Sequence, residues 1–140
     1  MSRRVLSLDL ADARRIIAAG ERKAVELNIP YHFAVVDAGG ALVAHVCMDG
    51  AWLGSANIAI DKAWTAQALD HSTEELARFA QAGQPAFGLN TTNDSRVVIF
   101  GGGIPIRMDG QAIGAVGASG GSVEDDVTVA RAAVAGFFDS

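Results

Sequence analysis

Three histidines and one cysteine are the residues of this 140-residue chain best suited to bind a metal or to move a proton at neutral pH. No pair among His32, His45 and His71 has the spacing of a zinc motif, and Cys47 alone cannot form an internal disulfide. Alternation along a strand places His45 on the same face as Cys47. His45 is therefore our first candidate for a general base or a metal ligand, ahead of His32 and His71. An ordinary buried histidine with a satisfied N–H is the alternative.

A second group of candidates follows the strand that carries His45. The segment Met48-Asp49-Gly50-Ala51-Trp52 brings a carboxylate and an indole to one edge of the predicted sheet, although Asp49-Gly50 is also a common turn. The helix predicted next carries Lys62, Trp64 and Thr65. Lys62 lies among alanines, so either its ammonium group reaches water on a long stem or it holds an anionic group.

Two glycine-rich segments complete the candidates. Gly117-Ala118-Ser119-Gly120-Gly121 matches the G-x-S-x-G pattern of hydrolase nucleophiles, but no histidine follows it to act as the base. We interpret it as a turn before a helix, where the N–H groups of Ser119 and Gly120 can hold a carboxylate or phosphate. No Lys-Ser/Thr follows Gly101-Gly102-Gly103, which excludes a phosphate loop. Glycine at Gly102 and Gly103 still lets a ligand approach the backbone closely.

Hydrophobic periodicity and turn residues predict the elements that must position these candidates. Helices are expected over about 10–27, 55–69, 72–83 and 122–138, and strands over 31–36, 42–47, 97–100, 104–108 and 111–117. Ser7 or Asp9, then Ser55, Ser72 and Ser122 are the expected N-caps. The order α-β-β-α-α-β-β-β-α predicts one α+β domain over residues 1–140. Its expected architecture is two layers, with a mostly antiparallel five-stranded sheet in a PAS- or profilin-like arrangement.

Composition excludes several classes of protein. The formal net charge is −5, which argues against a partner made of nucleic acid or an anionic membrane surface. No apolar run approaches the length of a membrane span, and no apolar stretch follows Arg3 and Arg4 as a signal peptide requires. We therefore expect a cytoplasmic protein that acts on a small molecule.

Several motifs together resemble the GlcG/HbpS-like family. They occur in the order and spacing typical of that family, from about Leu6 to Phe137: Ala34-Val35-Val36-Asp37-Ala38-Gly39-Gly40, Met48-Asp49-Gly50-Ala51, Lys62-Ala63-Trp64-Thr65-Ala66, Gly101-Gly102-Gly103-Ile104-Pro105-Ile106, Asp109-Gly110-Gln111, Gly114-Ala115-Val116-Gly117 and Ser119-Gly120-Gly121. The family includes a haem-binding and haem-degrading sensor and the C-terminal haem-binding domain of a corrinoid adenosyltransferase. It also includes a protein of a glycolate-utilisation cluster.

The resemblance implies a homo-oligomer of α/β domains and makes haem the first ligand to consider. In that interpretation His45, then His32 or His71, offers the axial nitrogen, Lys62 pairs with a propionate, and Trp52 or Trp64 stacks on the ring. The chain departs from the family's pattern at Val46-Cys47, at Trp52 and in a first helix without histidine.

Two other functions stay open. The first is a cofactor-free lyase, isomerase or hydratase acting on a small carboxylated catabolite, possibly an aromatic one. In that enzyme Asp49 or His45 would move a proton, Lys62 would hold the carboxylate and the glycine turns would supply N–H donors. The second is an accessory oligomeric subunit without catalysis.

Overall fold

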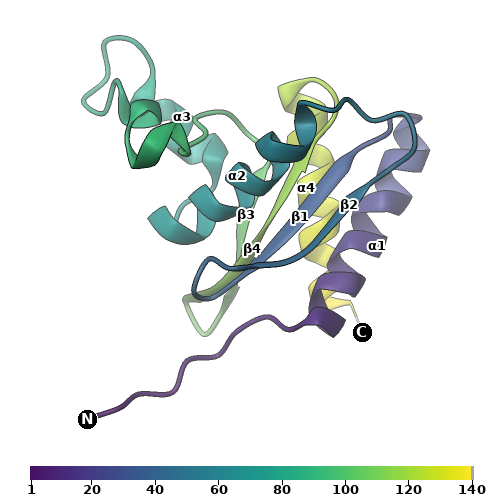
Figure 1. Ribbon diagram of the computed structural model, residues 1–140, viewed down its shortest axis with the longest axis horizontal. Helices are drawn as coiled ribbons and strands as arrows, with labels where there is room; N and C mark the ends of the chain where they lie inside the picture. The colour runs from purple at the N-terminus through teal and green to yellow at the C-terminus, as the bar shows by residue number, and fades with distance from the viewer. Residues whose placement is uncertain (140) are drawn as a thin grey trace.

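A four-stranded antiparallel sheet with helices on both faces forms the body of the protein (Figure 1). The computed structural model describes residues 1–139. Along the chain the elements are α1 (Leu10–Leu27), β1 (His32–Asp37), β2 (Leu42–Cys47), α2 (Ser55–Leu69), α3 (Thr73–Ala80), the 3-10 turns η1 (Leu89–Thr91) and η2 (Asn93–Ser95), β3 (Gly103–Met108), β4 (Gln111–Ser119) and α4 (Val123–Phe138). The strands lie in the order β2-β1-β4-β3.

The two faces of the sheet are covered unequally because successive side chains of β1 point to opposite faces. Phe33 and Val35 pack among large apolar side chains of α1 and α4. Ala34 and Val36 pack against a smaller cluster made largely of alanines of α2. The two helices α1 and α4 therefore build the main core, and α2 lies on the other face, closer to the sheet.

Part of the predicted architecture is confirmed and part is wrong. The structure is a single α+β domain with an antiparallel sheet. The prediction of two layers and five strands is wrong, since helices cover both faces and residues 97–100 form no strand. In that segment the backbone N–H of Val98 donates to the side-chain oxygen of Thr65 on α2 at 3.1 Å. The segment is therefore held by a helix and joins no neighbouring strand.

The predicted caps mostly hold. Asp9 caps α1 in a capping box with Asp12, and Ser72 does the same for α3 with Glu75. Ser122 accepts a hydrogen bond from the N–H of Asp125 at the start of α4. The prediction for Ser55 is wrong, because it is the buried first residue of α2 and Gly54 occupies the cap position. None of the described helices is both long and apolar enough to cross a membrane.

Close packing of α2 on β4 depends on one glycine. A methyl group at Gly117 would overlap the backbone of Ala59 and Ala63 on α2. A methyl group at Gly54, just before α2, would meet no atom within 4 Å.

We expect Gly117→Ala to lower the free energy of unfolding by about 2 kcal/mol or more, because α2 must move away from the sheet. Gly54→Ala, its matched control, should change this free energy by less than about 0.5 kcal/mol. Urea denaturation followed by circular dichroism measures both. Equal stability of the two variants would contradict the close approach.

Candidate functional site

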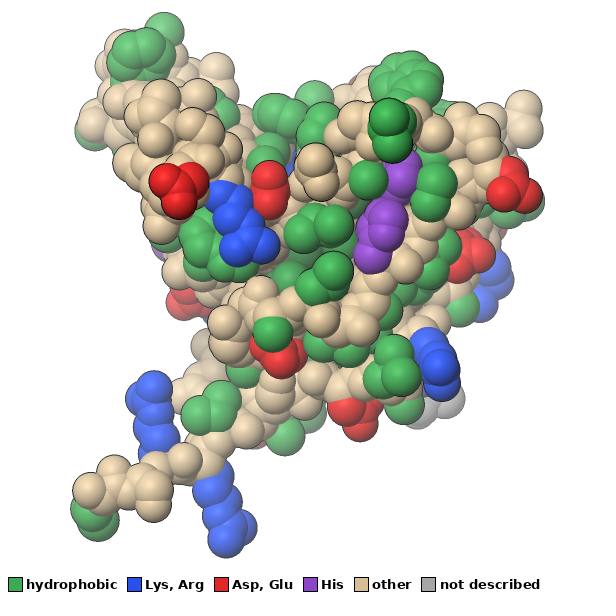
Figure 2. All heavy atoms as spheres, in the orientation of Figure 1, with side chains coloured by type: hydrophobic (Ala, Val, Ile, Leu, Met, Phe, Trp, Pro, Cys, Tyr) green, Lys and Arg blue, Asp and Glu red, His purple; other side chains and the backbone are tan. Residues whose placement is uncertain are grey.

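The face of the sheet that carries α2 is left open over β2. Helix α2 crosses β4, β1 and β3 and makes few contacts with β2. His45 and Cys47 of β2 are exposed there, and His32 of β1 lies beneath them with 3% of its surface exposed. Figure 2 shows histidine side chains on this face, bordered by hydrophobic ones.

The register of the hairpin brings the histidines and the cysteine together. His32 lies opposite Cys47, and Ala34 lies opposite His45, so His32 sits between the two β2 side chains. The loop after β2 then turns back over β1, and the Trp52 carbonyl reaches the imidazole of His32. This contact could not be inferred without the register and the path of the loop.

A chain of hydrogen bonds fixes the protons on both imidazoles. Nε2 of His32 lies 2.8 Å from the carbonyl oxygen of Trp52, and a carbonyl only accepts, so Nε2 carries a proton. Nδ1 of His32 lies 3.0 Å from Nε2 of His45, and the rings are nearly parallel, at 11°. In the neutral pair His45 therefore donates through Nε2, which leaves its Nδ1 unprotonated with a free lone pair.

Apolar side chains are exposed in the loop whose Trp52 carbonyl contacts His32. Trp52 and Leu53 are 69% and 90% exposed. Trp64 is half-buried, and the Arg96 guanidinium lies 4.4 Å from the centre of its ring. Trp52 therefore offers an indole for a ligand to contact, whereas one side of the Trp64 indole is already covered.

Lys62 does not reach water. Its side chain is fully buried, and its ammonium group donates to the Asp126 carboxylate at 2.7 Å and to the Ala118 carbonyl at 2.9 Å. Burial lowers the pKa of Lys62, and Asp126 opposes that shift. The ammonium charge thus has an internal partner, so the prediction that it holds a ligand anion or propionate gives way to a structural role.

Two more predicted site residues, Thr65 and Gly120, take part in hydrogen bonds within the chain, and a third, Ser119, is buried. Thr65 accepts from Val98 and donates to the Arg96 carbonyl at 3.3 Å. The N–H groups of Gly120 and Gly121 donate to the carboxylate of Asp126, and Ser119 is buried at the end of β4. Asp126 thereby occupies the place where an anion was expected, a role that no local sequence pattern signals.

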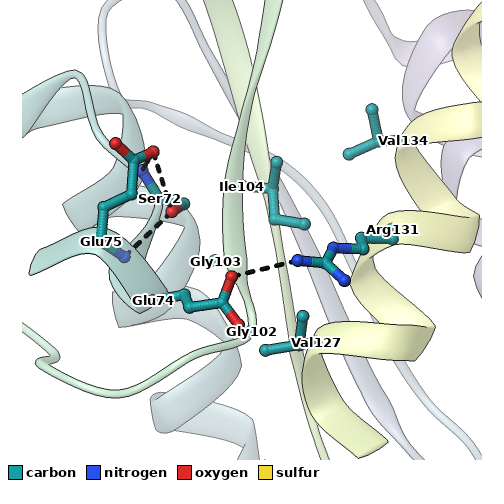
Figure 3. A pocket seen from close by; sticks show the side chains of 9 residues that line it. All are labelled: Ser72, Glu74, Glu75, Gly102, Gly103, Ile104, Val127, Arg131 and Val134. Carbon is teal, nitrogen blue, oxygen red and sulfur yellow. Dashed lines mark hydrogen bonds and ion pairs between the residues drawn. The ribbon is translucent and has the colours of Figure 1, made fainter. Parts of the chain in front are cut away.

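Two surface hollows are lined by further predicted site residues, one by Asp49 and the other by Gly102 and Gly103. Asp49 lines a surface hollow of about 240 Å³ beside Asn28 and Pro30. Gly102 and Gly103 line a hollow of about 310 Å³ between α3 and α4, with Ile104 on its floor (Figure 3). The structure does not bring Asp49 together with Lys62.

Sequence reasoning missed the charged rim of the hollow in Figure 3. Glu74 of α3 and Arg131 of α4 form an ion pair across it at 3.1 Å. These residues are 57 positions apart, and only the fold of the chain brings them together. His71 is exposed and lies edge-on to Phe79, away from the other two histidines. Within residues 1–139, no three side chains of the metal-ligating types are grouped to hold an ion.

Comparisons with known proteins agree over nearly the whole chain. The family model described as "Haem degrading protein HbpS-like" matches residues 8–135. A Citrobacter freundii relative, described as an uncharacterized 15.0 kDa protein in the dhaT-dhaS intergenic region, is 43% identical over 133 residues, which are 95% of this chain and 94% of the relative. The crystal structure of Klebsiella pneumoniae protein ORFY has a TM-score of 0.97 and 42% identity, covering 99% of this chain and 96% of that one. The crystal structure of a PduOC:Heme complex has a TM-score of 0.88 and 38% identity, covering 92% of this chain and 94% of that one.

The first prediction from the site concerns the charge of His45. Burial, and then the positive charge of His32, lower the pKa of His45 below the ordinary histidine value. Its nuclear magnetic resonance titration should therefore fall at lower pH than that of histidine in a short peptide. The native state binds this proton less readily than the unfolded chain does. The free energy of unfolding should therefore decrease as pH falls from the ordinary histidine pKa towards the lowered pKa of His45. His45→Gln should reduce that loss, and an identical slope of stability against pH in both proteins would contradict it.

The second prediction concerns the buried ion pair. Lys62→Met leaves the Asp126 carboxylate buried without its cation and should lower the free energy of unfolding by about 3–5 kcal/mol. Adding Asp126→Asn should recover part of this loss, because Asn keeps an acceptor for the two glycine N–H groups. Arg107→Met breaks the exposed Arg107–Asp70 pair and serves as the control, with an expected cost of about 1 kcal/mol or less. If urea denaturation gave equal costs for Lys62→Met and Arg107→Met, the buried pair would not have the role assigned to it.

Proposed function

The chain belongs to the HbpS-like family, and from this premise we propose that it binds haem on the open face of the sheet, with His45 as the iron ligand. The similarity to the PduOC:Heme structure supports haem as the ligand class. The single observation that carries the choice of residue is the 3.0 Å contact of Nε2 of His45 with Nδ1 of His32, which leaves Nδ1 of His45 free to bind iron.

The residues of this face suit the chemistry of a haem. Iron in haem takes an imidazole nitrogen as an axial ligand, and that nitrogen must be unprotonated. The bond from Nε2 of His45 to His32 meets this requirement, because it leaves Nδ1 of His45 as the acceptor. A hydrogen bond on the other ring nitrogen also orients the imidazole, as is usual for metal-bound histidines.

The exposed apolar side chains of the loop that contacts His32 would supply the rest of the proposed contact. Trp52 and Leu53 would lose unfavourable contact with water when covered by the porphyrin, and this burial favours binding. When bound, haem would supply the ligand exchange and electron transfer of its iron. The chain's own part is to offer Nδ1 of His45, to orient that ring through His32, and to shield one face from water.

The same exposed apolar surface supports our expectation of a homo-oligomer. Large exposed apolar patches are commonly covered by another protein chain. A second copy that covers Trp52 and Leu53 would also enclose a haem held by His45.

The structure favours haem binding over the cofactor-free enzyme. That enzyme required Asp49 or His45 to act beside a free Lys62, but Lys62 is bonded to Asp126 and Asp49 lies in a separate hollow. The cationic side chain that lines the hollow at Gly102 and Gly103 is Arg131, which is already paired with Glu74.

A haemin titration of the purified protein tests the proposal. We expect a saturable shift of the Soret band with one haem per chain. His45→Ala should change the spectrum and weaken binding at least about tenfold, a loss of about 1.4 kcal/mol. His71→Ala is the matched control and should bind as the native protein does, since His71 lies outside the cluster.

Two outcomes would contradict separate parts of the proposal. A response that does not saturate would overturn haem binding itself. Saturable binding with an unchanged spectrum in His45→Ala would leave haem as the ligand and overturn the choice of His45.

A further inference from the structure

We propose that residues 3–6 of one copy of this chain dock in the hollow of Figure 3 on a second copy. This contact is separate from the open face that is proposed to bind haem, and it requires no cofactor. It gives a partner to two features of the molecule that haem binding leaves unused, an exposed basic arm and a hollow with carboxylates at its rim.

Residues 1–6 form an extended arm that lies outside the core. All six are exposed, and Figure 1 shows the arm running away from the body of the protein. Val5 and Leu6 are 59% and 58% exposed. The arm is anchored just after them by Leu8, which is buried and donates its N–H to a carbonyl of β4 at 2.9 Å. Two neighbouring aliphatic side chains are therefore held in water, and covering them favours association.

The arm is basic in a chain whose net charge is negative. Arg3 and Arg4 directly precede Val5 and Leu6, and residues 1–8 contain no carboxylate side chain. The whole chain carries a formal net charge of −5. Figure 2 shows the basic side chains of the arm standing clear of the rest of the surface. A surface complementary to this arm combines carboxylates with an apolar depression.

The hollow in Figure 3 has an apolar floor. Ile104 of β3 and Val127 and Val134 of α4 line it, and its volume is about 310 Å³. Val127 and Val134 are seven positions apart, so they lie on one face of α4. Val123, one turn earlier on this face, is exposed. The floor therefore offers aliphatic contacts to aliphatic side chains such as those of the arm.

Carboxylates gather at the rim of this hollow. Glu74 and Glu75 of α3 line it, and Glu124 lies on α4 three positions before Val127, on the same face of the helix. Arg131, the cation among the lining residues, is exposed and pairs with Glu74 at 3.1 Å. Exposed pairs of this kind contribute little to stability, so Glu74 can exchange one cationic partner for another. The rim presents an excess of negative charge, which suits the two arginines of the arm.

The arm extends away from the hollow of its own copy. Leu8 bonds to β4 at Ile113, close to the turn that joins β3 to β4, whereas Gly102 and Gly103 of the hollow lie at the opposite end of β3. Figure 1 shows the arm continuing away from the end where α3 lies. A second copy therefore supplies the hollow. Two such contacts related by a twofold axis would close a dimer, with each arm in the hollow of the other copy.

Photochemical cross-linking of the full chain tests the proposal. A photoreactive benzoylphenylalanine replaces Leu6, and the control carries the same group at Val25, which is exposed on α1. After irradiation, the Leu6 protein should give a product of twice the chain mass on a denaturing gel. Peptide mapping should place the second end of the link within residues 102–104 or 127–134, and the Val25 control should give no link to these segments.

Charge substitutions in the arm test the role of the arginines in the protein labelled at Leu6. Arg3→Glu with Arg4→Glu should lower the yield of the double-mass product at least about fivefold, because like charges then meet at the rim. Arg22→Glu with Lys23→Glu is the matched control, since it makes the same change in net charge on α1. It should leave the yield unchanged.

A substitution on the floor of the hollow tests the apolar half of the contact. Val134→Asp should lower the yield at least about fivefold, because docking would bury its carboxylate without a partner. Val25→Asp is its control and should react as the labelled native chain does. Circular dichroism establishes that each variant is folded. The arm variants cover the case in which Val134→Asp fails to fold, since residues 3 and 4 lie outside the core.

Several results would overturn the proposal. These are a Leu6 protein that forms no double-mass product, a link that maps outside the hollow, and a yield that the arm substitutions leave unchanged. A link from Leu6 into the hollow within a product of single-chain mass would overturn the role of the second copy. All of these results leave the haemin titration unaffected, so the two proposals fail separately.

Discussion

The buried ion pair between Lys62 and Asp126 is the interaction on which the arrangement of this protein depends. It joins α2 on one face of the sheet to the first turn of α4 on the other, and Lys62 also donates to the Ala118 carbonyl of β4. Asp126 in turn accepts the N–H groups of Gly120 and Gly121, the turn between β4 and α4. A charge buried without this pairing would cost several kcal/mol, of order 3–5, so both helices are held in one position relative to β4.

This position of α2 leaves β2 uncovered. The helix is fastened at the β4 end by Lys62 and lies close to the sheet because Gly117 has no side chain. A helix so placed covers β4, β1 and β3, and β2 remains at the edge with His45 and Cys47 exposed. The open region over β2 is thus a consequence of where α2 packs on the same face of the sheet.

Local sequence patterns predicted the elements well because their causes are local. The caps Asp9, Ser72 and Ser122 and the hairpin at Asp109-Gly110 depend on residues within four positions of one another. The third predicted strand, over residues 97–100, does not form because Thr65, more than thirty positions earlier, accepts the hydrogen bond of Val98. The buried pairing of Lys62 was missed for the same reason, since its partner Asp126 is 64 positions away. For the candidate site, the sequence indicated His45 and placed it on the same face as Cys47. The contacts of His32 with both residues could not be predicted without the register of β1 on β2.

The proposed haem ligand and the hydrogen bond between the two histidines depend on the same proton. The Trp52 carbonyl accepts the proton on Nε2 of His32, so Nδ1 of His32 is the acceptor for the Nε2–H of His45. Iron bound at Nδ1 of His45 would favour keeping that proton on Nε2 of the same ring. The loop after β2 therefore determines, through His32, which nitrogen of His45 is free to bind a ligand.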